Sequence, residues 1–547
     1  MMKKMKRRKP LAFLLIFSMA AVILSGCGKL NGDETGQGQT GQEQTDQKQT
    51  DQEQTESDTA GTEAAWDTDK KDEIIVTVIN GYYTAGEKKL AEQYMKLHPE
   101  TKVTIDVIAD NNAYNTKMQT ILSSTDRSNT PDIVHSNFLG SVVGSPAMAL
   151  EQGYLFDMTQ VLDMEHPYQD GLVRDMYDEI LLTDTRNKSG GAGMQALPFD
   201  KCGISFFYNK TAFEALGVSA PETWEELLEI CQKFRDSGVE NPITVSSEAS
   251  WILASLADAG FRGQEYDFLV QPGDALWDET TMAANKDFVF DENDLACDTF
   301  TVDSTERQLM AKEDGIIFSD VSKNAWTEFA KLAQYFPENY IAGGSDTVTE
   351  FEVQLSPILL SGSWNVGLIL DDLNQMPAEK QFEWATFNVP GFADPPEGFG
   401  SQMRGLYVLG NVMGIVPKDD ADHQARVLDF YLYWYSQAGA QTCYEETLAN
   451  GNYVQGPCMI KGVDLSDEIN EKLEGFIVEG PVKQYSSELI GMSQCTEADR
   501  AVHNDLINRY IGGEIDLDTF LEGMNEIMHN YTLSQMSAGN YDLDPET

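Results

Sequence analysis

The chain of 547 residues is poor in cysteine, histidine and basic side chains, and each shortage excludes a class of protein. It has seven cysteines and six histidines, with no Cys-x-x-Cys pair and no two histidines at zinc-ligand spacing. Lys and Arg total 38 against 89 Asp and Glu, so the formal net charge is −51. Nucleic acids and anionic lipid surfaces attract cationic proteins, so neither is an expected partner.

Catalytic motifs are missing as well. The sequence contains no Gly-x-Ser-x-Gly, no His-Glu-x-x-His and no phosphate-binding Gly-Lys-Ser/Thr. A partial calcium-loop pattern at 291–296 has Leu295 and Ala296 where such a loop needs an oxygen ligand and a glycine. We therefore expect no metal, no cofactor and no enzymatic activity. A glycan-acting enzyme stays open as an alternative, because it needs only two carboxylates brought together in space.

The amino-terminal 27 residues have the pattern of an export signal. A basic cluster over Met1–Lys9 precedes an apolar stretch, Leu11–Ser25, that is too short to span a bilayer. Leu24-Ser25-Gly26-Cys27 resembles a bacterial lipobox, which implies cleavage after residue 26 and acylation of Cys27. Two or more acyl chains give stable membrane anchoring. We expect an extracytoplasmic protein attached to the cell membrane through the lipid on Cys27; the alternative is an uncleaved anchor.

Residues 27–72 are predicted to be a disordered linker. They hold almost no aliphatic residues and repeat the units TGQGQ, TGQEQ, TDQKQ and TDQEQ. Such a polar run cannot bury enough apolar surface to offset the entropy lost on ordering. About 45 flexible residues reach roughly 35–40 Å, so the linker would hold the folded body near the membrane without direct contact.

The body that follows begins with a β-α-β-α-β pattern. Apolar runs of strand length alternate with helical patterns over the ranges 74–79, 87–97, 102–109, 114–123 and 131–134. This order predicts a largely parallel sheet with helices on its faces. The length of the body, about 475 residues, favours two or three domains.

A more specific pattern occupies residues 197–228. A strand at Ile204–Tyr208 is followed by a short helix that stops at Gly217, and then by the capping box Thr223–Glu226. This ordered combination resembles the segment P…D…YNK…F…GV..P.TW.E of bacterial extracellular solute-binding proteins of family 1, the sugar-binding components of ABC importers. The helix after Thr223 would bury Trp224.

Further stretches resemble that family in the same order. They are Leu360–Trp364, Asn388–Gly391, and Gly405–Lys418 with the helix at about 421–438. The resemblance covers nearly all of 74–530, except 262–300 and 445–495. The aromatic residues at 430–435 are helically spaced, which favours a core role over a ligand contact.

The resemblance implies a type II periplasmic-binding-protein-like α/β fold with two lobes that close on a solute. Carried onto this chain, it places the N-terminal lobe at 74–197 plus 365–408 and the C-terminal lobe at 198–364 plus 409–547. The chain would cross between lobes near Leu197–Phe199, Leu359–Trp364 and Gly405–Asn411. It also implies a monomer that delivers a carbohydrate, most simply an oligosaccharide, to ABC-transporter permease subunits.

Sugars need aromatic rings against their C–H faces and planar polar groups for their hydroxyls. Loops after the predicted strands and the crossovers supply both types. The predicted ligand-binding residues are Tyr82, Tyr83, Asn112, Asn137, Asp200, Lys201, Trp251, Trp364 and Arg404.

Alternatives stay open for several of these residues. The tryptophans can be core, Asp200 can pair with Lys201, and Arg404 can form a structural ion pair. The solute can be other than a sugar, and a surface adhesion module is a third class of protein. Six cysteines lie in the body; Cys443 with Cys458 is the first disulfide to check, although wide spacings favour free thiols.

Overall fold

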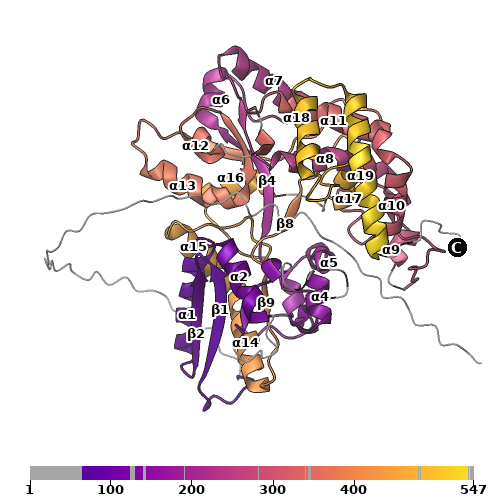
Figure 1. Cartoon of the computed structure of the whole chain (residues 1–547). Helices are drawn as coiled ribbons and strands as arrows, with labels where there is room; N and C mark the ends of the chain where they lie inside the picture. Colours follow the sequence, from indigo (N-terminus) through magenta and orange to yellow (C-terminus); the bar gives the residue numbers. More distant parts are fainter. Residues whose placement is uncertain are drawn as a thin grey trace, which may run out of the picture.

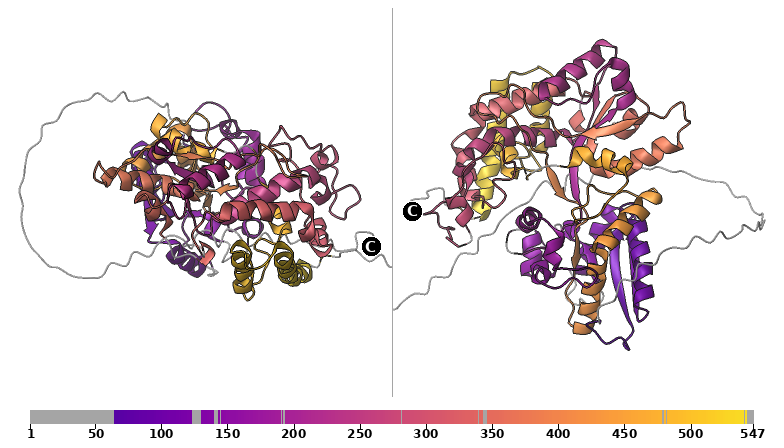
Figure 2. Two further views of the ribbon diagram at one scale, coloured as in Figure 1. Left: turned by 90° about the horizontal axis from the view of Figure 1, so that it is seen from above. Right: turned by 180° about the vertical axis from the view of Figure 1, so that it is seen from behind.

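The computed structural model describes residues 64–541, except for 123–129, 140–142, 144, 190, 192, 281, 339, 343–345, 478–479, 481 and 540. The predicted signal peptide, Cys27 and most of the predicted linker lie outside the described residues. Figure 1 shows two α/β lobes, one above the other, and the view from behind in Figure 2 shows the same division. Each lobe has its own sheet, as the resemblance predicted.

Lobe one, the lower lobe in Figure 1, is built on a four-stranded sheet with the order β2-β1-β3-β9. Its strands are β1 (Asp72–Ile79), β2 (Thr101–Ile108), β3 (Ile133–His135) and β9 (Met413–Ile415). Its described helices include α1 (Thr84–Leu97), α2 (Asn111–Leu122), α4 (Pro146–Glu151), α5 (Glu179–Lys188), α14 (Ala421–Trp434) and α15 (Gln437–Ala449). Because β1 pairs in parallel with β2 and β3, the predicted β-α-β-α-β opening is confirmed.

Lobe two contains a sheet with the order β5-β6-β4-β7, and β8 pairs with the start of β4. Its strands are β4 (Lys201–Asn209), β5 (Ile243–Thr244), β6 (Ile358–Gly362), β7 (Trp384–Phe387) and β8 (Tyr407–Leu409). The described helices include α6 (Lys210–Leu216), α7 (Trp224–Asp236), α8 (Ala249–Phe261), α9 (Ala283–Lys286), α10 (Thr305–Glu313), α11 (Asp320–Ala333), α12 (Thr347–Glu352), α13 (Val366–Gln375), α16 (Asp467–Leu473), α17 (Gln484–Leu489), α18 (Arg500–Ile511) and α19 (Leu517–Gly539).

Helix α7 forms for the reason its sequence suggests. The Thr223 hydroxyl accepts a hydrogen bond from the Glu226 backbone N–H at 3.2 Å, and the Glu226 carboxylate accepts one from the Glu222 N–H at 2.8 Å. Trp224 and the apolar face that follows it are buried in the main core of lobe two. Trp224 is therefore a core residue, as predicted.

Two of the later segments belong to the lobes opposite to those predicted, whereas the carboxyl-terminal segment 467–541 packs in the core of lobe two, where it was expected. The segment 365–408 carries β7, which pairs with β4 of lobe two. Residues after β8 return to lobe one, where β9 pairs with β3 and the orange helix α14 lies beside β1 in Figure 1. Lobe one is therefore 64–199 plus 411–449, and lobe two is 201–409 plus 467–541.

Three chain segments connect the lobes. Two lie where the resemblance put them, at the start of β4 and between β8 and β9. The predicted crossing at Leu359–Trp364 is wrong, because β6 lies inside the sheet of lobe two and leads into α13 of the same lobe. The third connection instead runs through 450–466. There the backbone of Cys458 pairs with that of Asp200 in an isolated antiparallel β-bridge.

The folded body also begins earlier than predicted. Trp66 is buried, and the side chain of Asp72 already starts the contacts of β1 with α14. The linker prediction is therefore wrong for 64–72.

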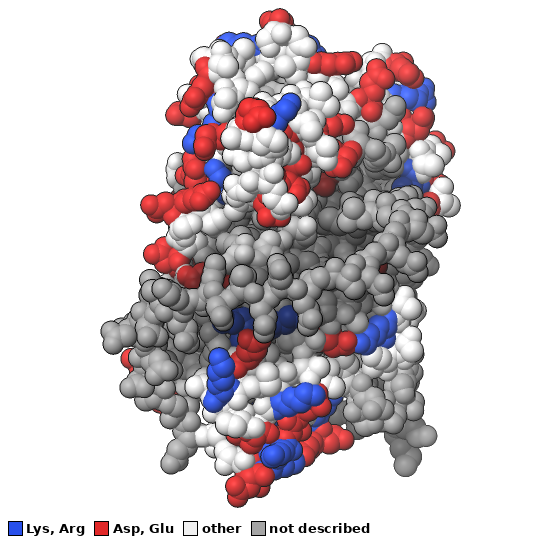
Figure 3. All heavy atoms as spheres, turned by 90° about the vertical axis from the view of Figure 1, so that its left-hand side faces the viewer, with Lys and Arg blue, Asp and Glu red and all other residues white. Residues whose placement is uncertain are grey.

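Surface and covalent features agree with the composition. Figure 3 shows acidic side chains scattered over the described part of one face, with basic ones between them. The six described cysteines are free thiols, Cys443 and Cys458 included. Within the described ranges, no helix is long and apolar enough to cross a membrane.

Candidate functional site

The carboxyl ends of the parallel strands in both sheets point toward the connecting segments. Directly after β1, the Gly81 carbonyl accepts a hydrogen bond from the backbone N–H of Tyr453, in the third connection, at 2.8 Å. Directly after β6, the Ser363 hydroxyl oxygen accepts one from the Gly203 N–H at 3.1 Å. In α/β proteins ligands bind outside the carboxyl ends of such strands. The junction of the two lobes is therefore the candidate ligand site.

Three partly buried aromatic residues lie at this junction. Tyr82 follows β1, and its backbone pairs with that of the second residue, Tyr453, in an isolated parallel β-bridge. The third residue, Trp364, follows β6 and lies at the edge of the core of lobe two. A Cβ added to Gly81 would lie 3.5 Å from the Tyr453 ring, and one added to Gly367 of α13 would lie 3.6 Å from it. The ring of Tyr453 thus lies close to Gly81 of lobe one and to Gly367 of lobe two.

Tyr453 was not among the predicted residues. It lies in the stretch 445–495, where the sequence resembles no family motif. Its place at the junction depends on its closeness to Gly81 and Gly367, which are far away along the chain. No local pattern around Tyr453 could have indicated these contacts.

Tyr83 and Asp200 lie together, but inside the connection. Both are fully buried, and the Tyr83 hydroxyl donates a hydrogen bond to the Asp200 carboxylate. That hydroxyl also accepts from the Gln455 N–H at 3.0 Å, and the Asn411 N–H donates to Asp200 at 2.6 Å. Asp200 therefore ties together all three connecting segments. Burial raises its pKa to about 6, although these hydrogen bonds lower it in part.

Lys201 lies over the ring of Tyr407, with its ammonium 4.7 Å from the ring centroid. The Tyr407 hydroxyl donates to Asp184 of α5 at 2.8 Å, and Lys188 of the same helix lies 4.3 Å from the same ring. Burial lowers the pKa of Lys201. Tyr407 thus links α5 of lobe one to Lys201, at the start of β4, where the first connecting segment enters lobe two.

The structure removes Trp251 and Arg404 from the ligand set. Trp251 is 5% exposed within the core of lobe two. The Arg404 guanidinium is buried and bonds to Asp258 at 2.6 and 2.8 Å and to Asp298 at 2.8 Å. For Trp251 the core alternative holds, and for Arg404 the structural ion pair holds, with all partners in lobe two.

The two predicted asparagines belong to lobe one. Asn112 is exposed in the first turn of α2, after β2. Asn137 lies in the short helix η1 (Ser136–Leu139), which follows β3. Both therefore come from the carboxyl edge of the sheet, as predicted, and stay candidates.

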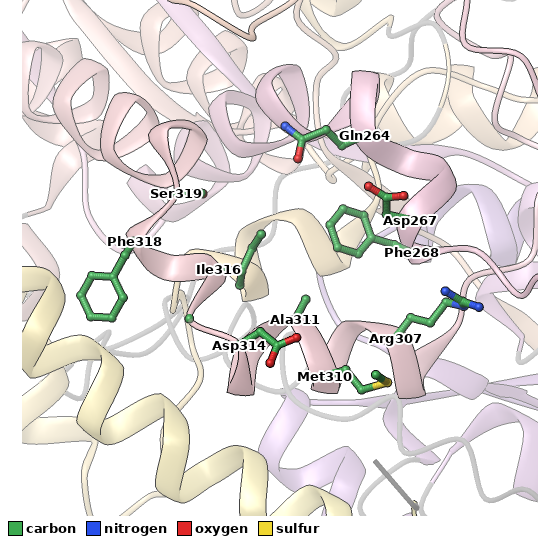
Figure 4. Close-up of a pocket in the computed structure, with 11 residues that line it drawn as sticks. Gln264, Asp267, Phe268, Arg307, Met310, Ala311, Asp314, Ile316, Phe318 and Ser319 are labelled. Atoms are coloured by element: carbon green, nitrogen blue, oxygen red, sulfur yellow. The ribbon is translucent and has the colours of Figure 1, made fainter. Parts of the chain in front are cut away.

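A separate hollow of about 560 Å³ lies within lobe two (Figure 4). It is bounded by η4 (Arg262–Phe268), α10 and η5 (Ile316–Phe318). Asp267, Arg307 and Asp314 supply polar groups, and Phe268 lies between them. None of the predicted ligand residues lines this hollow, so the strand topology, rather than the hollow, locates the candidate site.

Metal binding finds no support in the part of the chain that the structure describes. No group of three His, Cys, Asp or Glu side chains there could hold an ion. The partial calcium-loop pattern at 291–296 instead makes internal turns, in which the Asp291 and Asp294 carboxylates accept backbone N–H bonds.

Fold and site together define a bilobal binding protein with the periplasmic-binding-protein fold. A family model of the bacterial extracellular solute-binding proteins matches residues 80–441, which is more than half of the chain. The chain belongs to this family, whose members are non-enzymatic solute-binding proteins of the ABC-import type. No curated protein matches the sequence.

Solved structures agree on the fold at low sequence identity. RafE bound to raffinose has 17% identity and a TM-score of 0.52, over 84% of this chain and 100% of that one. The cyclic alpha-maltosyl-1,6-maltose binding protein from Arthrobacter globiformis has 15% identity and a TM-score of 0.51, over 85% and 100%. UgpB from Mycobacterium tuberculosis, bound to glycerophosphocholine, has 14% identity and a TM-score of 0.52, over 84% and 99%.

Proposed function

We propose that this protein captures a carbohydrate, with an oligosaccharide as the favoured form, between its two lobes and delivers it to the permease of an ABC importer. The observation that carries the proposal is the set of partly buried aromatic residues at the lobe junction, Tyr82, Trp364 and Tyr453. They come from lobe one, lobe two and the third connection. Rings in these three places can cover a sugar on more than one face when the lobes close.

The remaining predicted residues divide between two roles. Asn112, Asn137 and Lys201 are proposed to bind hydroxyl groups of the solute. Tyr83 and Asp200 are proposed to hold the connecting segments in place, because both are buried and bonded to one another.

RafE with raffinose and the maltosyl-maltose binding protein support a sugar, but UgpB with glycerophosphocholine favours a second candidate. Aromatic side chains also bind quaternary ammonium groups through cation–π attraction. A polar non-sugar solute is therefore the alternative function.

Calorimetry distinguishes the two functions. The probes are raffinose, maltotetraose, chitotriose, xylotriose and glycerophosphocholine. We expect one of the saccharides to bind reversibly and without product formation, and Tyr453→Ala to weaken that binding. Binding of glycerophosphocholine alone would establish the alternative, and new reducing ends after incubation would contradict both.

We also propose that Cys27 is acylated and that the protein works as a monomer at the cell membrane. The lipobox resemblance and the polar linker support this arrangement. A Cys27→Ala chain should appear in the culture medium, whereas the wild-type chain should stay with the membrane fraction. Equal partition of the two chains would contradict lipid anchoring.

A further inference from the structure

Residues Ala64–Asp72, here called the strap, are packed against lobe one. Trp66 is 7% exposed, and its ring centroid lies 5.3 Å from that of His98, at the end of α1. The Trp66 indole N–H also donates to the Glu100 carboxylate at 3.3 Å. The beginning of the strap is therefore fixed by an aromatic contact and a hydrogen bond.

Helix α14 binds the rest of the strap. Arg426, whose side chain is fully buried, donates to the Asp67 carbonyl at 2.5 Å and to the Asp72 carboxylate at 3.0 Å. Lys70 forms an ion pair with Asp420, the residue that caps this helix. The strap thus joins β1 beside the amino-terminal end of α14, at the end of the sheet opposite to the lobe junction.

His423 of α14 lies between two carboxylates at this point. Its Nδ1 is 2.5 Å from an Asp72 oxygen, and its Nε2 is 2.8 Å from an Asp132 oxygen. A neutral imidazole donates through one nitrogen only. The lone pair on its other nitrogen would then face a carboxylate, which is unfavourable. The imidazolium cation can donate to both carboxylates at once, so this geometry favours a proton on each nitrogen.

The charges around His423 are mixed. Asp72 and Asp132 contact the ring, and Asp420 accepts from the backbone N–H of His423. The cations near it, Arg426, Lys418 and Lys70, contact these same three carboxylates, and none of these contacts involves the imidazole. The hydrogen bond to Asp132 raises the pKa of His423, burial opposes this, and the bond to Asp72 adds to it.

We propose that the strap is a proton-dependent clasp, in which the His423 imidazolium binds Asp72 to lobe one and loss of its proton loosens the strap while the lobes stay folded. Because the pKa of His423 is raised on folding, the contact is complete below about pH 6.5 and is lost as the pH rises through the folded value. In acid, Ala64 would then be held at one fixed place on the body, opposite to the lobe junction.

Hydrogen exchange measured by mass spectrometry tests the clasp on the full chain in detergent. Exchange of the amides at 66–72 is compared at pH 5.5, 7.0 and 8.5 after correction for the intrinsic rate. A hydrogen bond to a charged group corresponds to about a tenfold change or more, so protection should fall at least tenfold between pH 5.5 and 8.5. Amides in the sheet of lobe two should show no such change.

Two variants make the test specific. His423→Gln keeps one donor but cannot titrate, so its strap should exchange equally at the three pH values. His529→Gln, in α19 of lobe two, removes a histidine that pairs with Glu313 and should retain the wild-type pH dependence. The same dependence in His423→Gln as in wild type would overturn the proposal.

A second measurement does not depend on the variant. The imidazole resonances of wild-type His423 should titrate with a pKa above 6.5, together with a shift of the Trp66 indole resonance. A His423 pKa below 6.5, or a Trp66 resonance that does not change with it, would also overturn the proposal. Neither readout involves a solute, so the outcome is independent of the proposed transport function.

Discussion

Both lobes gather several charged side chains around a central cation, but the two clusters differ in exposure and in the kind of cation at the centre. In lobe two the side chains of Arg404, Asp258 and Asp298 are at most 1% exposed. In lobe one the side chains of His423 and Asp72 are 15% and 21% exposed. A guanidinium stays charged at every pH, whereas an imidazole titrates near neutrality. The buried cluster is therefore a permanent part of the core, and the partly exposed cluster can respond to pH.

The buried cluster in lobe two extends to residues for which the sequence resembled no family motif. Lys483 donates to Thr301 and Asp303 at 3.0 Å, and Thr301 donates to Glu265 at 3.1 Å. Burial raises the pKa of Glu265, and the nearby ammonium of Lys483 opposes this shift. These bonds hold the segment 262–303 to the loop before α17.

The largest expected effect is that of Arg404→Met. This change leaves Asp258 and Asp298 buried without their cation, and breaking a buried ion pair in this way costs about 3–5 kcal/mol of folding free energy. Urea unfolding of the wild type and the variant measures the difference. Solute affinity of the protein that remains folded should be unchanged, because the Arg404 contacts all lie within lobe two.

Arg307→Met is the matched control, since Arg307 forms a two-bond pair with Asp274 but its side chain is 29% exposed. This pair should contribute about 1 kcal/mol or less. Equal losses of unfolding free energy in the two variants would show that burial does not decide how much these ion pairs contribute to stability. A selective loss of affinity in Arg404→Met would return Arg404 to the ligand set.

Asp200 is a second buried ionisable group. Its effect on folding stability changes with pH in the direction opposite to that of a carboxylate in a stabilising ion pair. Its pKa is about 6 in the folded chain and about 3.9 in an unfolded one, so the folded state binds the proton more tightly. Stability therefore falls as the pH rises from about 4 to 6, by about 3 kcal/mol from this group. Asp200→Asn stays neutral, and its stability advantage over wild type should grow across that interval.

Urea unfolding at pH 4, 5, 6 and 7 measures this difference. The control is Asp163→Asn, because the Asp163 side chain is 79% exposed. It gives the baseline for the loss of an exposed carboxylate, one that pairs with Arg174. A difference between Asp200→Asn and wild type that does not change with pH would show that the Asp200 carboxylate is charged in the folded state throughout this range.

The contrast between the two lobes also explains what could be predicted from the sequence. The strands of lobe one at 72–79 and 101–108 alternate with helices over short distances, so their periodicity was sufficient. The capping box at Thr223 was equally local. Tyr82 was predicted from its place after the first strand, and it lies at the junction of the lobes. Trp364 was predicted from a crossing that the structure does not contain, and it lies at the junction because β6 ends there.

The predictions that were wrong depended on contacts between residues far apart in the sequence. Strands β7 and β9 have four and three residues, too short for a periodic signal, and their pairing partners decide which lobe each segment joins. Arg404 finds Asp258 and Asp298 at separations of 146 and 106 residues. In the sequence it stands just before a connecting strand, a position equally suited to a ligand contact.

Trp364→Ala should have a smaller effect than the buried charges, and on binding instead of folding. Trp364 is partly buried at the end of β6, so loss of its indole removes apolar contact with the solute at about 25 cal/mol per Å². We expect at least tenfold weaker binding of the saccharide identified by calorimetry, about 1.4 kcal/mol, with a modest fall in melting temperature.

Trp251→Ala is the matched control within the same lobe. Because Trp251 is a core residue, its removal should lower the melting temperature strongly and leave the affinity of folded protein unchanged. If the two variants behave alike, the distinction between junction and core tryptophans fails, and Tyr82 and Tyr453 become the remaining stacking candidates.

The smallest effect is expected from removal of the linker. A chain that begins at Ala64 keeps Trp66 and its contacts with His98 and Glu100, and it lacks the predicted signal peptide, Cys27 and the polar linker up to residue 63. Its affinity and its melting temperature should match those of the full chain, because the repeats have no apolar side chains with which to bind a solute. A chain that begins at Glu73 should bind equally well but melt at a lower temperature, since it also loses the buried indole and the Asp72 pairs. A tenfold weaker affinity in the Ala64 chain would instead show that the linker takes part in binding.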